Sequence, residues 1–136
     1  MILVDTSAWI DFFRNKGPVA AVVDDLLGAD EVALCGPIVT ELRRGLRSGE
    51  RKKIMAMLDG CHILPDPLHL WEEAGDLGCA LGRKGATVKT LDLLIATYAL
   101  SASVPILTTD KDFQMIRRVA THLLLEPTSL PGAGLV

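Results

Sequence analysis

Short runs of consecutive apolar residues alternate along the chain with longer segments that carry apolar residues at helical spacing. The short runs cover 2–4, 32–35, 62–64 and 105–108, and a last run covers 123–125. A strand that is buried on both faces of a parallel sheet has an unbroken apolar run, because neither face meets water. The pattern therefore predicts a parallel sheet made of short, fully buried strands.

The segments between these runs predict helices. Trp9, Phe12 and Phe13 recur at helical spacing, and the next helix begins at Gly17 and is closed by Gly28. The pattern predicts five further helices, one beginning at Gly36 and the others covering about 50–58, 67–83, 90–102 and 113–119. Strands that alternate with helices indicate an α/β fold, in which ligands bind outside the carboxyl ends of the parallel strands.

Length and composition fit one domain. The chain has 136 residues, 49% of them hydrophobic and 23% charged, which is typical of a single globular domain. We expect this domain to cover 1–126 and the Pro- and Gly-rich residues 127–136 to form a C-terminal tail. The mean hydropathy of +0.33 is high for a soluble monomer, so we expect another subunit to cover part of the apolar surface.

Charge and cysteine usage limit the function and the compartment. The net charge of −3 excludes a domain that binds nucleic acid through an overall basic field, so any affinity for RNA must be local. The three cysteines are widely spaced and fit neither a disulfide framework nor a CxxC metal site, which favours the cytoplasm. The start, MILVD, lacks the basic region of a signal peptide, and polar residues interrupt the apolar segment 91–107, which disfavours a membrane span.

Four acidic side chains lie where predicted strands end or predicted helices begin. Asp5 ends the first strand, and we expect Glu41 near the first turn of the helix after the second strand. Thr90 is expected to cap a helix that carries Asp92 in its first turn, and Asp110 follows the fourth strand directly. In a parallel sheet these positions meet at one edge, so the four carboxylates are expected to converge.

Converging carboxylates repel one another unless a cation compensates them. Oxygen ligands without a cluster of His or Cys favour Mg²⁺ or Mn²⁺, which promote phosphodiester hydrolysis by stabilising the attacking and leaving oxygens. Asp5 would be the central ligand, Asp92 and Asp110 would complete the metal site, and Glu41 would bind metal or orient the water. Each acid taken alone is explained equally well by the general preference for acidic residues at helix starts.

Four motifs surround these acids, in the order MILVDTSAWID, PIVTELRRG, LDLLIATYA and TTDKDF. In order and spacing they resemble the motifs of VapC-type PIN-domain ribonucleases, the toxins of type II toxin–antitoxin systems, over nearly the whole chain. The resemblance implies a three-layer α/β sandwich with a central parallel sheet, a homodimer, dependence on Mg²⁺ or Mn²⁺, and endonucleolytic cleavage of single-stranded RNA. It also implies a cognate antitoxin whose basic and apolar segment occupies the acidic site.

The resemblance assigns the acidic quartet to the four acids named above, and it adds two supporting residues. Thr6 matches a polar position whose hydroxyl could bind an acid or a water molecule on the ion. Asp112 matches a second acid of the last motif, which either reaches the metal or caps the following helix, and we expect the cap.

The densest basic stretch of the chain follows Glu41 in sequence. Arg43, Arg44 and Arg47 begin this stretch, and they could hold RNA phosphates near the metal. A solvated helix face explains the same residues equally well.

Two other functions stay open at this point. A phosphohydrolase of the haloacid-dehalogenase type also begins with a strand that ends in Asp, but Ser7 occupies the position where that family needs its second acid. A non-catalytic module could use the acidic pocket only to dock a basic partner. Docking needs negative charge but not four acids in the positions of metal ligands, so the nuclease is the favoured interpretation.

Overall fold

The structure is a computed structural model that describes residues 1–126, and the predicted tail at 127–136 lies outside the described residues. Four parallel strands form one sheet in the order β3-β2-β1-β4. They are β1 (Ile2–Val4), β2 (Val32–Leu34), β3 (His62–Ile63) and β4 (Ile106–Leu107). The predicted parallel sheet is confirmed, and the run at 123–125 adds only an isolated parallel bridge between Leu125 and Ile106.

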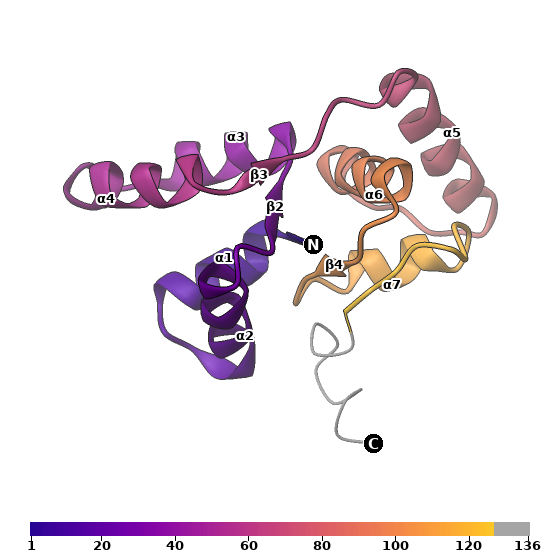
Figure 1. The fold of residues 1–136 in the computed structure, drawn as a ribbon. Coiled ribbons are helices and arrows are strands. Elements are labelled where there is room, and N and C mark those ends of the chain that lie inside the picture. Colours follow the sequence, from indigo (N-terminus) through magenta and orange to yellow (C-terminus); the bar gives the residue numbers. More distant parts are fainter. Residues whose placement is uncertain (127–136) are drawn as a thin grey trace.

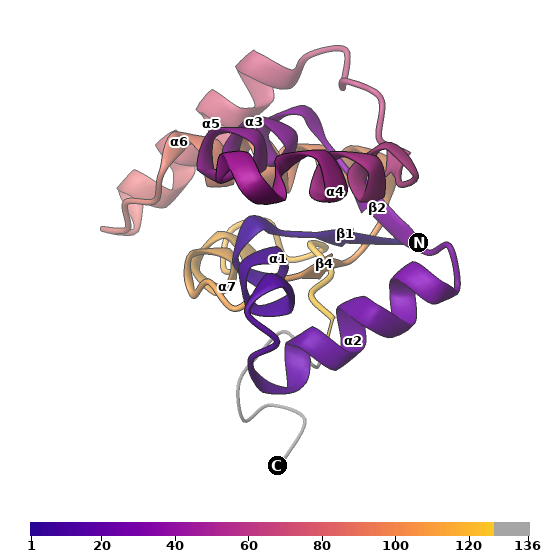
Figure 2. The same ribbon diagram turned by 90° about the vertical axis from the view of Figure 1, so that its left-hand side faces the viewer.

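Seven helices of the described chain connect and cover these strands. They are α1 (Thr6–Phe13), α2 (Gly17–Gly28), α3 (Gly36–Gly45), α4 (Ser48–Asp59), α5 (Leu70–Arg83), α6 (Thr90–Ala102) and α7 (Asp112–Arg117). Helices α1 to α4 lie on one face of the sheet, at the left in Figure 1, and α5 to α7 lie on the other. Figure 2 looks at the first group from the front, with the sheet behind it.

Right-handed crossover connections explain this division into layers. The steps from β1 to β2 and from β2 to β3 run in one direction across the sheet, so their helices lie on one face. The step from β3 to β4 returns past β1 in the opposite direction, which places α5 and α6 on the other face. The predicted three-layer α/β sandwich is therefore confirmed.

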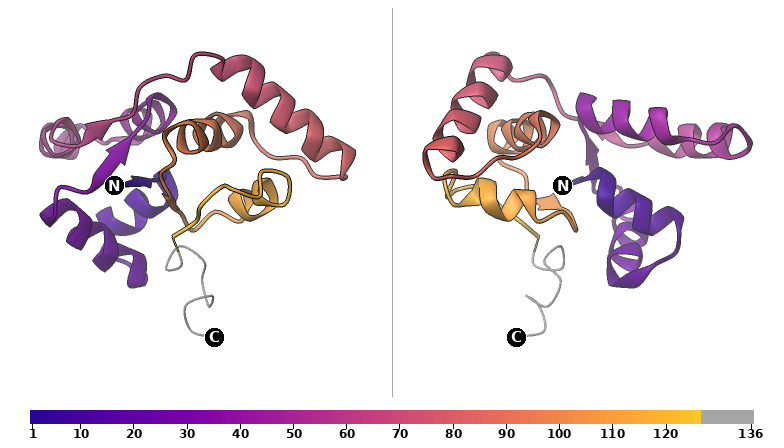
Figure 3. Two further views of the ribbon diagram at one scale, coloured as in Figure 1. Left: turned by 45° about the vertical axis from the view of Figure 1, so that its right-hand side comes forward. Right: turned by 180° about the vertical axis from the view of Figure 1, so that it is seen from behind.

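Helix α6 lies between the sheet and α5 (Figures 1 and 3). All eight residues from Asp92 to Ala99 are buried, so this helix meets protein on every side of its first turns. A helix that is apolar all round is expected in such a position. The burial of α6 carries the carboxylate of Asp92 into the interior.

Some predicted boundaries are wrong by a few residues. The predicted start of α3 at Gly36 is confirmed, but Glu41 is the sixth residue of this helix and lies in its second turn, one turn later than expected. Thr90 is the first residue of α6 and does not cap it, since the N-cap position belongs to Lys89, whose side chain makes no capping bond. Helix α5 begins at Leu70, three residues later than the start predicted at 67.

The core is built mainly from aliphatic side chains, with Trp9 and Phe113 as its largest members. All three cysteines, Cys35, Cys61 and Cys79, are free, and Cys35 is buried. Within residues 1–126, none of the helices has the length and apolar character that a membrane crossing requires.

Close packing of α5 on α6 gives a test of this arrangement at Gly78. A Cβ atom at Gly78 would lie 2.8 Å from Cδ1 of Leu93, whereas a Cβ atom at Gly75 on the same helix meets nothing within 4 Å. Because Cδ1 is the far end of the Leu93 side chain, this atom can move away in part, and we expect Gly78→Val to lower the free energy of unfolding by about 1 kcal/mol through overpacking. Denaturant unfolding measures this, with Gly75→Val as the control for the propensity of valine in a helix. Equal stabilities of the two variants would contradict the α5–α6 packing.

Candidate active site

The carboxyl ends of β1 and β4 lie side by side at the edge of the sheet where a ligand is expected. These strands are neighbours in the sheet, and the chain leaves them toward opposite faces, into α1 and α7 respectively (Figure 1). Such a switch point opens a crevice at the carboxyl ends of the strands. Asp5 follows β1 directly, and Thr108 and Asp110 follow β4.

Asp5 is a buried carboxylate with only 3% of its surface exposed. Its Oδ2 atom accepts hydrogen bonds from Ser7 Oγ at 2.9 Å and from Thr108 Oγ1 at 2.8 Å. Burial raises the pKa of Asp5, these two hydroxyl groups oppose that rise, and the negative charge of Glu41 adds to it. The two bonds occupy one carboxylate oxygen.

The same two hydroxyl groups tie the loop after β4 to the start of α1. The Thr109 N–H donates to Ser7 Oγ at 3.0 Å, and the Asp110 N–H donates to Thr108 Oγ1 at 2.9 Å. Sequence reasoning missed Ser7 and Thr108 as parts of the site. The available signal was the position of Thr108, a polar residue at the end of a fully buried strand.

A tight group of three carboxylates lies beside Asp5. Asp92, Asp110 and Asp112 each offer one carboxylate oxygen, and these oxygens all lie within 4.8 Å of one another. Asp92 is only 6% exposed, and its Oδ2 atom is buried with no hydrogen-bond partner among the described residues. Burial, a hydrogen bond shared with Asp112 and the charges of Asp110, Asp5 and Asp112 raise the pKa of Asp92 to about 8.

The expectation that Asp112 caps the last helix is wrong. Asp112 is the first residue of α7, one position past the N-cap residue Lys111. The N-cap residue is the one whose side chain accepts hydrogen bonds from the unpaired N–H groups of the first helical turn. Instead, Asp110 Oδ1 accepts the N–H of Asp112 at 2.9 Å. Asp112 therefore directs its carboxylate into the three-acid group.

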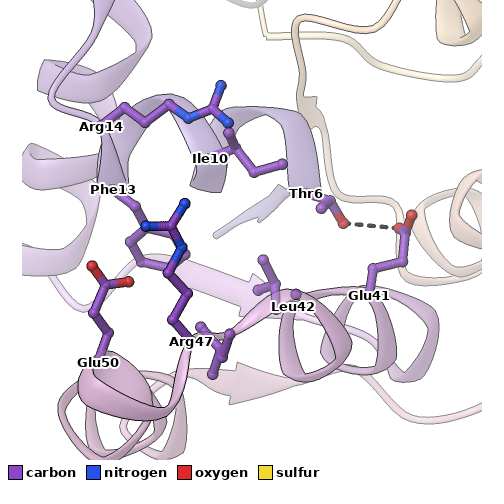
Figure 4. A pocket seen from close by; sticks show the side chains of 10 residues that line it. Thr6, Ile10, Phe13, Arg14, Glu41, Leu42, Arg47 and Glu50 are labelled. Carbon is purple, nitrogen blue, oxygen red and sulfur yellow. Dashed lines mark hydrogen bonds between the residues drawn. The ribbon is translucent and has the colours of Figure 1, made fainter.

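Glu41 stands at the other side of Asp5, on α3. The hydroxyl Oγ1 of Thr6 donates to Glu41 Oε1 at 2.8 Å (Figure 4). Glu41 is half-buried and does not belong to the three-acid group, but its charge acts on Asp5. The charge of Glu41 acts on Asp5, and the charge of Asp5 acts on Asp92, so electrostatic interactions link the four acids named from the sequence.

The donor set suits a hard divalent cation. It consists of carboxylate and hydroxyl oxygens, without a histidine or cysteine in the three-acid group. The unpartnered Oδ2 of Asp92 supports a fit, since a buried carboxylate oxygen without a donor is costly unless something positive binds it.

The three arginines of the basic stretch differ in their surroundings. Arg43 contacts Met55 Sδ through Nη1 at 3.3 Å, and Arg44 is exposed. Arg47 lines a cavity that also contains Thr6 and Glu41 (Figure 4). Among the three, Arg47 is the one that shares a cavity with a residue of the acidic site.

Sequence comparison relates the chain to known proteins over most of its length. The PIN domain family matches residues 2–119. The VapC ribonuclease Mb1587 of Mycobacterium bovis is 34% identical over 125 residues, which cover 88% of this chain and 93% of that protein. Ribonuclease VapC11 of Mycobacterium tuberculosis matches with the same identity and coverage.

Solved structures share the fold. VapBC-1 from nontypeable Haemophilus influenzae superimposes with a TM-score of 0.72 at 24% identity, covering 93% of this chain and 97% of that one. FitAcB from Neisseria gonorrhoeae gives a TM-score of 0.70 at 26% identity, covering 96% of this chain and 100% of that one. The matched sequence, the buried acidic edge and the shared fold lead to one conclusion: the chain belongs to the PIN-domain family and, within it, to the VapC ribonucleases.

Proposed function

We propose that this protein is a divalent-metal-dependent endoribonuclease that acts as the toxin of a toxin–antitoxin pair. The observation that carries the proposal is the group of three carboxylate oxygens within 4.8 Å, one of them from the buried Asp92. Such a group accumulates negative charge that only a cation or protons can offset. The relatives named VapC ribonuclease support RNA as the substrate.

The position of each site residue suggests its role in the reaction. Asp92, Asp110 and Asp112 would hold the cation, with Asp5 beside them. A bound Mg²⁺ or Mn²⁺ supplies positive charge and Lewis acidity to the scissile phosphate. Glu41, held by Thr6 at 2.8 Å, would accept a hydrogen bond from the attacking water and orient it. Ser7 and Thr108 would hold one oxygen of Asp5 and thereby leave the other for the site.

The first prediction is metal-dependent cleavage that requires both buried acids. We expect purified protein to cut labelled single-stranded RNA with Mg²⁺ or Mn²⁺ and not with EDTA. Asp5→Asn and Asp92→Asn should each reduce kcat/KM by more than about a hundredfold, because even residues that only support a metal ligand cost 10–100-fold when they are removed. Gel analysis of the RNA fragments measures the rates.

A matched control is Asp24→Asn, which removes an exposed acid of α2 that lies outside the site. Its activity should equal that of the wild type. A phosphohydrolase of the haloacid-dehalogenase type would instead release phosphate from a phosphomonoester. A docking module would bind metal or partner without cutting any RNA, and that result would sink the nuclease proposal.

The second prediction concerns pH, through the raised pKa of Asp92. In the unfolded chain this carboxyl has its ordinary pKa of 3.8, and in the metal-free fold its pKa is about 8. Between these values the folded protein holds a proton that the unfolded chain has lost, so the free energy of unfolding falls as the pH rises. We expect the Tm in EDTA to decrease from pH 5 to pH 8, and Asp92→Asn to weaken this decrease.

Metal should reverse the trend, because a cation binds the deprotonated carboxylate. With saturating Mn²⁺ the gain in Tm should grow from pH 6 to pH 8 in the wild type and stay small in Asp92→Asn. Thermal unfolding with and without the ion measures both effects. A gain that is independent of pH would contradict the assignment of Asp92 as a ligand.

The partner that we propose is a cognate antitoxin with a basic segment. Among the solved structures with this fold is VapBC2 from Rickettsia felis bound to a DNA fragment from their promoter. The acidic edge of the sheet is complementary in charge to a basic peptide segment. If this is correct, the product of the adjacent gene inhibits RNA cleavage by the purified protein, and a lack of inhibition counts against it.

We further propose a homodimer, and the apolar surface suggests where it forms. Leu68, two residues before α5, is 89% exposed, and Trp71, the second residue of α5, is 71% exposed, although side chains of this kind are usually covered. We expect Trp71→Ser to shift the mass measured by light scattering from dimer toward monomer. Trp71 lies outside the core, so the Tm of the monomer should change little. A monomeric wild type would rule out this dimer.

A further inference from the structure

A cavity of roughly 360 Å³ begins at the acidic site and extends away from the three-acid group. Figure 4 shows the Thr6–Glu41 hydrogen bond at one end of this cavity and the side chains of Arg14, Arg47 and Glu50 toward the other. One wall belongs to α1 and the other to α3 and the start of α4. We call it the α1–α3 pocket. Its volume lies within the usual range of clefts for small ligands.

The middle of the α1–α3 pocket is apolar. Ile10 and Phe13 from α1 face Leu42 from α3 across it (Figure 4). Leu42 is buried, whereas Ile10 is 38% exposed and Phe13 is half-buried. Of the aromatic residues of α1, Trp9 is fully buried in the core. Phe13 instead presents part of its ring surface to the pocket.

The outer end of the α1–α3 pocket carries two free cations. Arg14 and Arg47 are both exposed, and neither guanidinium forms a hydrogen bond or an ion pair with another residue of the described chain. Arg51 differs, because its Nη1 atom donates to the backbone carbonyl of Arg43 at 3.3 Å. Guanidinium groups that are not engaged by the protein are suited to bind phosphate oxygens.

We infer that the α1–α3 pocket binds one nucleotide of the RNA next to the bond that is cut. Its base would lie against Ile10 and Phe13, and a backbone phosphate would bind Arg14 and Arg47. Glu50, exposed at the same end, would accept a hydrogen bond from an N–H group of the base. This inference rests on the proposed ribonuclease function, and it names the part of the protein that positions the substrate.

The lining of the pocket holds two cations, Arg14 and Arg47, and two acids, Glu41 and Glu50. The two exposed guanidinium groups at the outer end are the part that suits a phosphodiester backbone, which brings the opposite charge, whereas a lysine or arginine side chain would bring like charge to them. The apolar middle suits the face of a base, since base stacking on apolar and aromatic side chains tolerates many sequences. Continuity with Glu41 places a bound nucleotide beside the acidic site.

The experiment separates binding from cleavage by using Asp5→Asn as the background. The probe is a fluorescein-labelled single-stranded RNA of about ten nucleotides, within the range that such proteins cover. Fluorescence anisotropy gives Kd at several salt concentrations. We expect Arg14→Gln and Arg47→Gln each to raise Kd and to reduce the slope of log Kd against log salt by about 0.7, the value for one contact to a single strand.

The matched control is Arg118→Gln, which removes an exposed arginine next to α7, away from the pocket. Its Kd and salt slope should equal those of the background. An equal loss in all three variants would show diffuse binding over the surface and would overturn the inference. Because all three side chains are exposed, their removal should leave the Tm unchanged.

A second measurement tests the apolar middle of the pocket with the active enzyme. RNA substrates that each lack one base near the cut are compared with the intact RNA. One abasic position should raise KM on the order of tenfold, the size expected for loss of one stacked base. In Ile10→Ala the same abasic position should raise KM much less, because the side chain that the base contacts is already missing.

The outcomes distinguish the inference from the function on which it rests. A wild type that cuts no RNA defeats the proposed function, yet the anisotropy still tests nucleotide binding. Cleavage by the wild type with unchanged Kd and KM in Arg14→Gln and Arg47→Gln overturns the pocket. Weaker binding of the antitoxin in these variants, with RNA binding intact, also overturns it and identifies a protein occupant.

Discussion

Asp5 directly after β1 and Asp92 in the first turn of α6 expose 3% and 6% of their surfaces, and this burial of carboxylates is the constraint on which the surrounding structure depends. A buried carboxylate is costly in the charged form unless it gains hydrogen bonds or a nearby cation. Asp5 gains two hydroxyl donors, whereas one oxygen of Asp92 gains none. The two carboxyl groups therefore differ in the metal-free fold. Hydrogen bonds hold Asp5, whereas the pKa of Asp92 is raised to about 8.

The strand order and the helix layers determine where Asp5 and Asp92 lie. Because β4 inserts beside β1, the loop after β4 reaches Asp5, and Thr108 can donate to it across 103 positions of sequence. Helix α6 places Asp92 in the protein interior because α5 and the sheet enclose the first turns of this helix. The net charge of −3 provides no general attraction for a polyanion, so binding of the proposed RNA substrate would depend on local cations such as Arg14 and Arg47.

The fold was predictable because its signals are local. Unbroken apolar runs identified the strands, and the Gly and Pro residues at 17–18 and 36–37 marked helix starts within a residue of those observed. The errors also have local causes. Thr90 is a good capping residue by type, but the chain enters α6 one residue earlier, at Lys89. Asp112 is likewise a good cap by type, yet its position inside α7 turns the carboxylate toward Asp92 and Asp110. Residue type gives a preference, and the exact entry of the chain into the helix decides the contact.

The sequence by itself determined which acids end strands or begin helices, and four family motifs named the same acids. It also determined that the sheet is parallel, since periodicity and the alternation of elements are properties of the chain alone. Only the tertiary structure decided that Ser7 and Thr108 bind Asp5, that Asp112 joins the three-acid group, and that one arginine of the basic stretch shares a cavity with Glu41. These contacts join segments far apart in sequence. Their distances depend on packing and strand order, which no single segment encodes.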